Sequence, residues 1–110
     1  MAPAVLKAKH YILLILDSET TPKQAKLLLG SANKIQLLAI TEIFKNILHL
    51  KVTDQPKLKR TLKRNSQLIH FLASTSTPAK HKMNLIRQSS QIVFSLIVVM
   101  RLAILSTLTK

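Results

Sequence analysis

The residues whose type and spacing best suit a chemical role, that of binding anions, are the cations of segment 57–64. Five of its eight positions are basic, namely Lys57, Lys59, Arg60, Lys63 and Arg64. At about 100° per residue they fall within an arc of roughly 160° on a helix, whereas Leu58, Leu62 and Ile69 cluster within about 40° on another side. This pattern predicts an amphipathic helix whose charged face binds phosphate, because no acidic residue interleaves with the cations. The alternative interpretation is a solvated face that keeps the protein soluble.

A second group of cations follows at Lys80, Lys82 and Arg87. We interpret both groups as contacts to the nucleic-acid backbone, which neutralise phosphates and release counterions. Such contacts position a protein on nucleic acid without reading its bases. Recognition by base stacking is disfavoured, because it needs exposed aromatic residues. The chain has only four aromatic residues, and Phe44 and Phe94 lie in apolar stretches.

The positive charge is unevenly distributed along the chain of 110 residues. The formal net charge is +13, from 17 basic and 4 acidic residues. Residues 1–54 carry a net of +3, whereas residues 55–110 hold ten basic residues and no acidic one. This asymmetry predicts a polyanionic partner: nucleic acid first, with an anionic membrane surface or an acidic protein as alternatives.

No set of residues in the sequence suits catalysis or metal binding. The chain has no cysteine and a single glycine, so it offers no thiol nucleophile, no Cys-based zinc site and no Gly-rich phosphate loop. Its four histidines, at positions 10, 49, 70 and 81, lack the spacing of metal ligands. No nucleophile–base pair can be nominated. We therefore expect a protein that is not an enzyme, with no catalytic residue, no metal and no cofactor.

Helix signals dominate the elements that must position the cations. Residues 4–16 form the first expected helix, and 22–30 the second, begun by a Thr21–Gln24 capping box and ended near Gly30 in the left-handed conformation. A largely apolar helix over 34–50, capped by Asn33, is expected to be central. The cationic helix follows a cap at Thr53 or Asp54, and Thr77 caps a helix that runs to Gln88. The fold class is therefore all-α: one domain, 1–110, that is a compact bundle of four to six short helices.

Two Thr-Pro pairs raise the alternative that a helix–turn–helix unit is duplicated. At an offset of 56 residues Thr21 matches Thr77, Pro22 matches Pro78 and Leu16 matches Leu72. The competing explanation is that both stretches use the same helix-start signal, because helices generally share it.

The apolar segment 91–108 carries the alternative functions. As a helix, Ile92–Leu108 would be about 25 Å long, which is short for a hydrocarbon core of about 30 Å, and Arg101 lies just past its midpoint. We therefore expect a core or interface helix, with Arg101 reaching the surface along its aliphatic stem. The alternatives are a membrane-active accessory protein and a structural module that packs against a partner, either a second copy or a capsid protein.

A family resemblance joins several of these segments. Pro22-Lys23-Gln24-Ala25-Lys26, Lys59-Arg60, Leu72-Ala73, the Ala39–Glu42–Ile43 spacing and the Asn46–Leu48 spacing carry it. Over roughly residues 10–88 the chain resembles small basic proteins encoded by Maverick/Polinton-type elements, which include adintovirus-like double-stranded DNA viruses. The resemblance implies a virion core or accessory role and a location in the nucleus or the virion.

Overall fold

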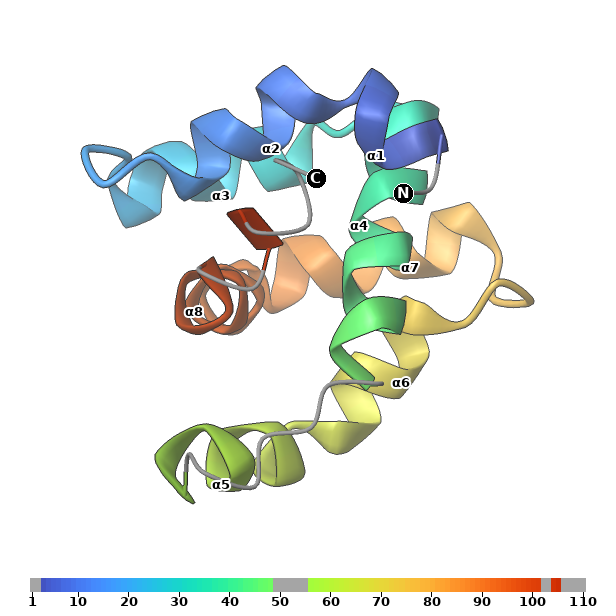
Figure 1. Ribbon diagram of the computed structural model, residues 1–110. Coiled ribbons are helices and arrows are strands. Elements are labelled where there is room, and N and C mark those ends of the chain that lie inside the picture. Colours follow the sequence, from blue (N-terminus) through green and yellow to red (C-terminus); the bar gives the residue numbers. More distant parts are fainter. Residues whose placement is uncertain (1–2, 49–55, 102–103, 106–110) are drawn as a thin grey trace.

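Eight helices make up most of the described residues, and Arg101, Ile104 and Leu105 beyond the last of them are also helical. The computed structural model describes residues 3–48, 56–101 and 104–105, and no strand occurs within these ranges. The helices, in chain order, are α1 (Pro3–Lys7), α2 (Lys9–Leu16), α3 (Pro22–Gly30), α4 (Lys34–Leu48), α5 (Pro56–Arg64), α6 (Ser66–Ala73), α7 (Ala79–Gln88) and α8 (Ser90–Val99) (Figure 1). The all-α prediction is confirmed, and the radius of gyration of 12.9 Å matches about 13 Å for a folded chain of this length.

Single-residue breaks raise the number of helices above the expected four to six. Ala8 (φ −100°, ψ 18°), Asn65 (φ −106°, ψ 20°) and Ser89 (φ −120°, ψ 27°) each separate two consecutive helices. These dihedral angles lie near the bridge region, where the chain changes direction without leaving a turn-like conformation. The carbonyl of each break residue still accepts the first hydrogen bond of the next helix, at 2.9–3.0 Å. The expected helix over 4–16 and the long cationic helix are therefore each a pair of short helices.

Two of the expected helix starts are confirmed and one is wrong. Thr21 and Gln24 form the reciprocal capping box, at 2.9 and 3.2 Å. Asn33 and Gln36 form an equivalent pair at 2.9 and 2.8 Å. Thr77 does not cap, because Pro78 takes the cap position with an extended ψ of 144° and accepts from the Lys82 N–H. The expected caps Thr53 and Asp54 lie outside the described residues.

Gly30 also departs from expectation. It belongs to the last turn of α3, and its φ is not positive. Ser31, with φ −111° and ψ 16°, follows it as the C-terminal cap, and its side-chain hydroxyl donates to the Leu27 carbonyl at 2.7 Å. The helix therefore ends on a serine rather than on a left-handed glycine.

Helix α4 is central to the core, as its sequence predicts. Seven of its fifteen residues are buried, and Phe44 is completely inaccessible. It packs against α1, α6 and α7. The apolar segment at the C-terminus also contributes to the core, because α8 buries Val93, Leu96 and Ile97. Ser90–Val99 is therefore a helix that packs in part into the core, Arg101 beyond it is half-buried, and residues 102–103 and 106–108 of the expected helix lie outside the described residues.

The helix pattern of the first unit, α1–α4, repeats in the second unit, α5–α8. Both α2 and α6 are eight residues long, and Ser66 follows Lys9 by 57 positions. Buried residues repeat with this spacing: Ile12 and Ile69, Ile15 and Leu72, Leu16 and Ala73, Ala25 and Lys82, Leu29 and Ile86. The structural offset is thus 57 rather than 56. The two Thr-Pro pairs are therefore not equivalent, because the second lies one position earlier relative to its helix.

The helix contacts between the two units also occur in equivalent pairs. Helix α4 packs against α6, and α8 packs against α2. Helix α3 likewise packs against α8, as α7 does against α4, and α3 and α7 contact each other directly. Exchanging the two units maps the first two contacts onto each other, the next two onto each other and the α3–α7 contact onto itself, although the paired contacts differ in extent. The structure therefore supports the duplicated unit through its burial and packing.

Candidate nucleic-acid interface

Helix α5 positions the first group of cations. Lys, Leu and Arg are good helix formers, and Pro56 occupies the first position, where its missing N–H costs no helical hydrogen bond. Lys63 and Arg64 lie in the last turn, where positive charge interacts favourably with the helix dipole. The local sequence therefore favours a helix that ends in two cations.

The attachment of α5 to the body orients its charged face outward. The helix packs against α6 and α8, and the half-buried Leu62 contacts the core. The side-chain amide nitrogen of Asn65 donates to the Thr61 carbonyl at 2.9 Å, which fixes the break between α5 and α6. Of the expected apolar stripe, Ile69 is buried in α6, while the side chain of Leu58 is outside the described part.

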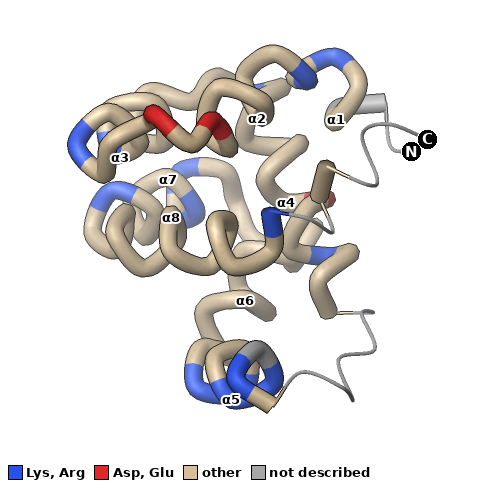
Figure 2. Tube along the Cα trace, turned by 60° about the vertical axis from the view of Figure 1, so that its left-hand side comes forward, with Lys and Arg blue, Asp and Glu red and all other residues tan. Residues whose placement is uncertain are grey.

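All five predicted cations of α5 are exposed: Lys57, Lys59, Arg60, Lys63 and Arg64. Figure 2 shows basic residues gathered on α5, which lies at one end of the molecule. Lys59 and Lys63 are four residues apart, as are Arg60 and Arg64, so like charges face each other on adjacent turns. A bound polyanion would remove this repulsion, because each phosphate places negative charge between the two cations.

The structure does not gather Lys80, Lys82 and Arg87 into one surface. Lys80 and Arg87 are exposed and two turns apart on α7, hence on one side of it. Lys82 is only 4% exposed, so its ammonium group cannot contact a phosphate on the surface. The assignment of Lys82 to the interface is therefore corrected. A sequence signal existed, because Lys82 precedes Ile86 by four residues and shares its buried side of the helix.

Lys82 instead joins two helices inside the protein. Its Nζ donates to Thr41 Oγ1 at 2.8 Å, and that hydroxyl donates to the Leu37 carbonyl at 3.1 Å. Burial lowers the pKa of Lys82 from its ordinary value of 10.5, and the negative charge of Glu42 opposes this shift only in part. Lys82 is therefore a polar link between α7 and α4.

Arg87 is exposed, and it also makes a hydrogen bond to another helix of the protein. Its Nε donates to the Gly30 carbonyl at 3.0 Å, at the C-terminal end of α3. A cation there satisfies a helix-end carbonyl and complements the helix dipole. The exposed Lys26 lines the same shallow pocket as Arg87. The spacing along the chain did not reveal this pair, because α3 and α7 are brought together only by the packing of the two units.

In the described ranges, the aromatic, histidine and acidic side chains form neither an exposed stacking surface nor a metal site. None of the four aromatic side chains is exposed: Phe44 is buried, while Tyr11, Phe71 and Phe94 are half-buried. His10, His70 and His81 are exposed, and His49 lies outside the described residues. Among residues 3–48, 56–101 and 104–105, no three His, Asp or Glu side chains come together as metal ligands would.

The hydrophobic helices are short. In the described part of the chain, no single helix has both the length and the apolar composition needed to cross a membrane. Helices α3 and α4 meet the two criteria only when taken together, and they are bent by 115° relative to each other.

Comparisons with known proteins identify no relative, because no protein-family model, curated protein or solved structure matches this chain.

Proposed function

We propose that this protein is a non-enzymatic basic protein that binds the nucleic-acid backbone non-specifically through helix α5. The observation that carries the proposal is the exposure of five cations on one short helix, held outward by its apolar contact with the core. Residues 55–110 contain no acidic residue, so no carboxylate on α5 or its neighbours in this half competes with phosphate. Lys80 and Arg87 are the exposed cations of α7, which add to the positive charge of the second unit.

The binding mode follows from the kinds of side chain on this surface. Lys and Arg bind phosphate oxygens and release counterions, which gives strong salt dependence and little dependence on base sequence. Stacking on bases is disfavoured, since the four aromatic side chains are buried or half-buried. The resemblance to Maverick/Polinton-type basic proteins extends the proposal to a virion core or accessory role, in the nucleus or the virion.

The test measures the affinity for a fluorescent duplex of arbitrary sequence over a range of salt concentrations. Substituting Lys59, Arg60, Lys63 and Arg64 together with Gln should lower the slope of log affinity against log salt by about 3 to 4, at roughly 0.9 per phosphate contact. Gln is a good helix former, so the circular dichroism spectrum should not change.

A charge-matched control separates a site from general attraction. Lys7, Lys9, Lys23 and Lys34 are exposed residues of the first unit, and substituting all four with Gln removes the same charge. This variant should keep most of the slope. Equal losses in the two variants would show attraction by net charge alone, and unchanged binding in the α5 variant would remove this helix from the interface.

A structural assembly module is the second candidate, and exposed apolar side chains favour it. Leu6, Leu14, Leu27, Ile35 and Leu38 are 44–68% exposed, all in the first unit. Self-association that follows protein concentration but not salt, measured by sedimentation, would support this candidate over binding to nucleic acid.

A further inference from the structure

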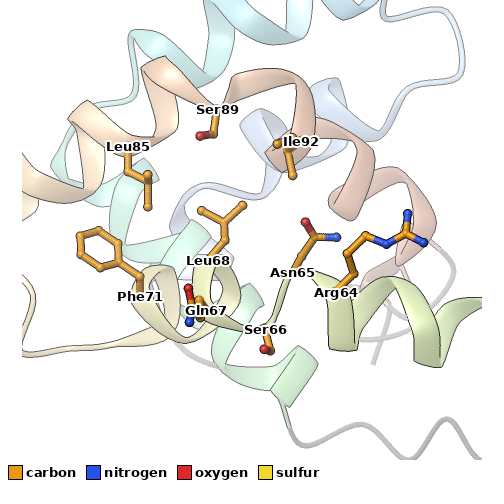
Figure 3. A pocket seen from close by; sticks show the side chains of 9 residues that line it. All are labelled: Arg64, Asn65, Ser66, Gln67, Leu68, Phe71, Leu85, Ser89 and Ile92. Carbon is orange, nitrogen blue, oxygen red and sulfur yellow. The ribbon is translucent and has the colours of Figure 1, made fainter.

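A groove opens in the second unit between α6 on one side and α7 and α8 on the other. It has a volume of about 600 Å³, within the range of sites for small molecules. Figure 3 shows Arg64 and Asn65 at one end and Phe71 and Leu85 at the opposite end, with Leu68 pointing into the space between them. The groove therefore has its one cation at one end and its aromatic side chain at the other, and four apolar residues line it together with Ser66, Gln67 and Ser89.

The repeat shows why the groove is open. At the spacing of 57 residues, Leu68 corresponds to Tyr11 and Leu85 corresponds to Leu28. In the first unit the Tyr11 hydroxyl donates to the Leu28 carbonyl at 2.8 Å, so the aromatic side chain bridges α2 and α3. The shorter Leu68 makes no such bridge, and the hollow beside it is wider than the equivalent hollow of the first unit, about 600 Å³ against about 310 Å³.

The two ends of the groove also differ from their counterparts. Phe71 stands where the first unit has Leu14, which lines a smaller hollow of about 310 Å³. Asn65 replaces Ala8 and brings an amide to the mouth of the groove beside Arg64. The second unit thus has a wider groove than the first, with a more polar entrance.

We infer that this groove binds a single-chain anionic amphiphile, such as a long-chain fatty acid. Its carboxylate lies at the Arg64 end; the exposed Arg64 side chain, which points away from the groove in Figure 3, turns toward it and its guanidinium donates two hydrogen bonds to the two oxygens. Its chain lies along four apolar side chains, those of Leu68, Phe71, Leu85 and Ile92. Charge supports the choice of an anion, because the half of the chain that forms the groove has ten basic residues and no acidic one. The inference is independent of nucleic-acid binding, although Arg64 belongs to both surfaces.

The first experiment titrates the full chain with sodium oleate, below its critical micelle concentration, by isothermal titration calorimetry. One equivalent should bind. Dodecylammonium has an apolar chain and the opposite charge, whereas acetate has the carboxylate alone, and neither should bind measurably. Binding of many equivalents, or equal binding of dodecylammonium, would overturn the inference.

The decisive variant is Leu68→Tyr, which places in the second unit the residue that fills the first. The packing around Tyr11 shows that this position in the repeat accommodates a tyrosine, and oleate affinity should fall at least tenfold. Leu27→Tyr is the control, because Leu27 is 68% exposed in the first unit and lies outside the groove. It should bind oleate as the unmodified protein does, and so should Lys59→Gln, whereas Arg64→Gln should weaken binding about fivefold.

A second measurement uses the unmodified protein and does not depend on the folding of a variant. Stearate with a nitroxide on its chain should broaden the methyl resonances of Leu68, Leu85 and Ile92, but not those of Leu14 and Leu27. Broadening at Leu14 and Leu27 to the same extent would refute the site. Anionic phosphatidylglycerol vesicles distinguish the source of the amphiphile: cosedimentation without binding of free oleate would indicate a membrane surface and exclude the groove.

Discussion

Lys82 of α7 donates from its Nζ to Thr41 Oγ1 of α4 across a distance of 2.8 Å, so the two units share a hydrogen bond within the core. Position 82 corresponds to the buried Ala25 in the first unit, at the spacing of 57 residues. The same place in the repeat therefore holds a small apolar side chain in one unit and a long cationic one in the other. Because burial disfavours the ammonium ion, this lysine lowers stability unless its hydrogen bond compensates.

Replacing Lys82 with Met should leave the protein as stable as before, or stabilise it by up to about 1 kcal/mol near pH 7. The substitution keeps the length of the side chain and removes the buried charge, while the Thr41 hydroxyl keeps its hydrogen bond to the Leu37 carbonyl. Denaturant unfolding provides the measurement. A loss of more than about 1 kcal/mol would show that the link to Thr41 outweighs the desolvation.

The stability should also depend on pH through Lys82. Its folded-state pKa is lowered from 10.5, so between that lowered pKa and 10.5 the unfolded chain binds more protons than the folded chain. Unfolding free energy therefore rises with pH across this window, as the cost of burying the charge disappears. The Lys82→Met variant should lack this rise, and any advantage it has at pH 7 should shrink toward pH 10.

Tyr11 should have the opposite pH dependence. Burial raises its pKa from 10.0 to about 12, so its stabilising contribution is complete below pH 10 and is lost as pH rises toward 12. Because the chain has one tyrosine, absorbance at the tyrosinate band reports this titration directly. A midpoint near 10 would contradict the half-buried, hydrogen-bonded position of the Tyr11 hydroxyl. Tyr11→Phe should lower the unfolding free energy by about 1 kcal/mol at pH 7, because the hydrogen bond to the Leu28 carbonyl is lost. This variant should not lose further stability between pH 10 and pH 12.

The limits of the sequence are clearest at particular residues. Local sequence patterns predicted the helices, the central position of α4, and the caps at Thr21 and Asn33. Each of these patterns lies within a single helix or at its first turn. Such patterns did not predict the breaks at Ala8 and Asn65, because non-glycine residues in a bridge conformation carry no composition signal, whereas the break at Ser89 agrees with the expected helix end at Gln88. Lys82 was wrongly predicted to lie on the surface because its side chain is charged. Its spacing of four residues from Ile86 nevertheless placed it on the buried side of the helix. The Arg87–Gly30 contact depends on the packing of two units, which no local pattern encodes.

The two threonines that precede prolines should respond differently to substitution. Thr21→Ala should lower unfolding free energy by about 1 kcal/mol, because the Thr21 hydroxyl accepts from the Gln24 N–H at 3.2 Å. Thr77→Ala should change it little, since no side chain caps α7. Thermal or denaturant unfolding of the two variants gives a matched comparison. Equal costs at the two sites would place Thr77 at a cap after all.

Gly30→Ala should stabilise the protein, by about 0.5–1 kcal/mol. Gly30 lies in the last turn of α3 without a positive φ, so an L-residue fits its backbone conformation. A Cβ there would meet its nearest neighbour, Arg87 Cγ, at 3.7 Å, which is an ordinary van der Waals contact. The gain arises because alanine restricts the unfolded chain more than glycine does. Denaturant unfolding should compare the single variant Gly30→Ala with the double variant Gly30→Ala/Arg87→Gln. This comparison separates the effect of alanine on the unfolded chain from any effect on the hydrogen bond between Arg87 and the carbonyl of residue 30. A loss of stability in the single variant that disappears in the double variant would mean that the methyl group displaces the arginine, contrary to the spacing seen here.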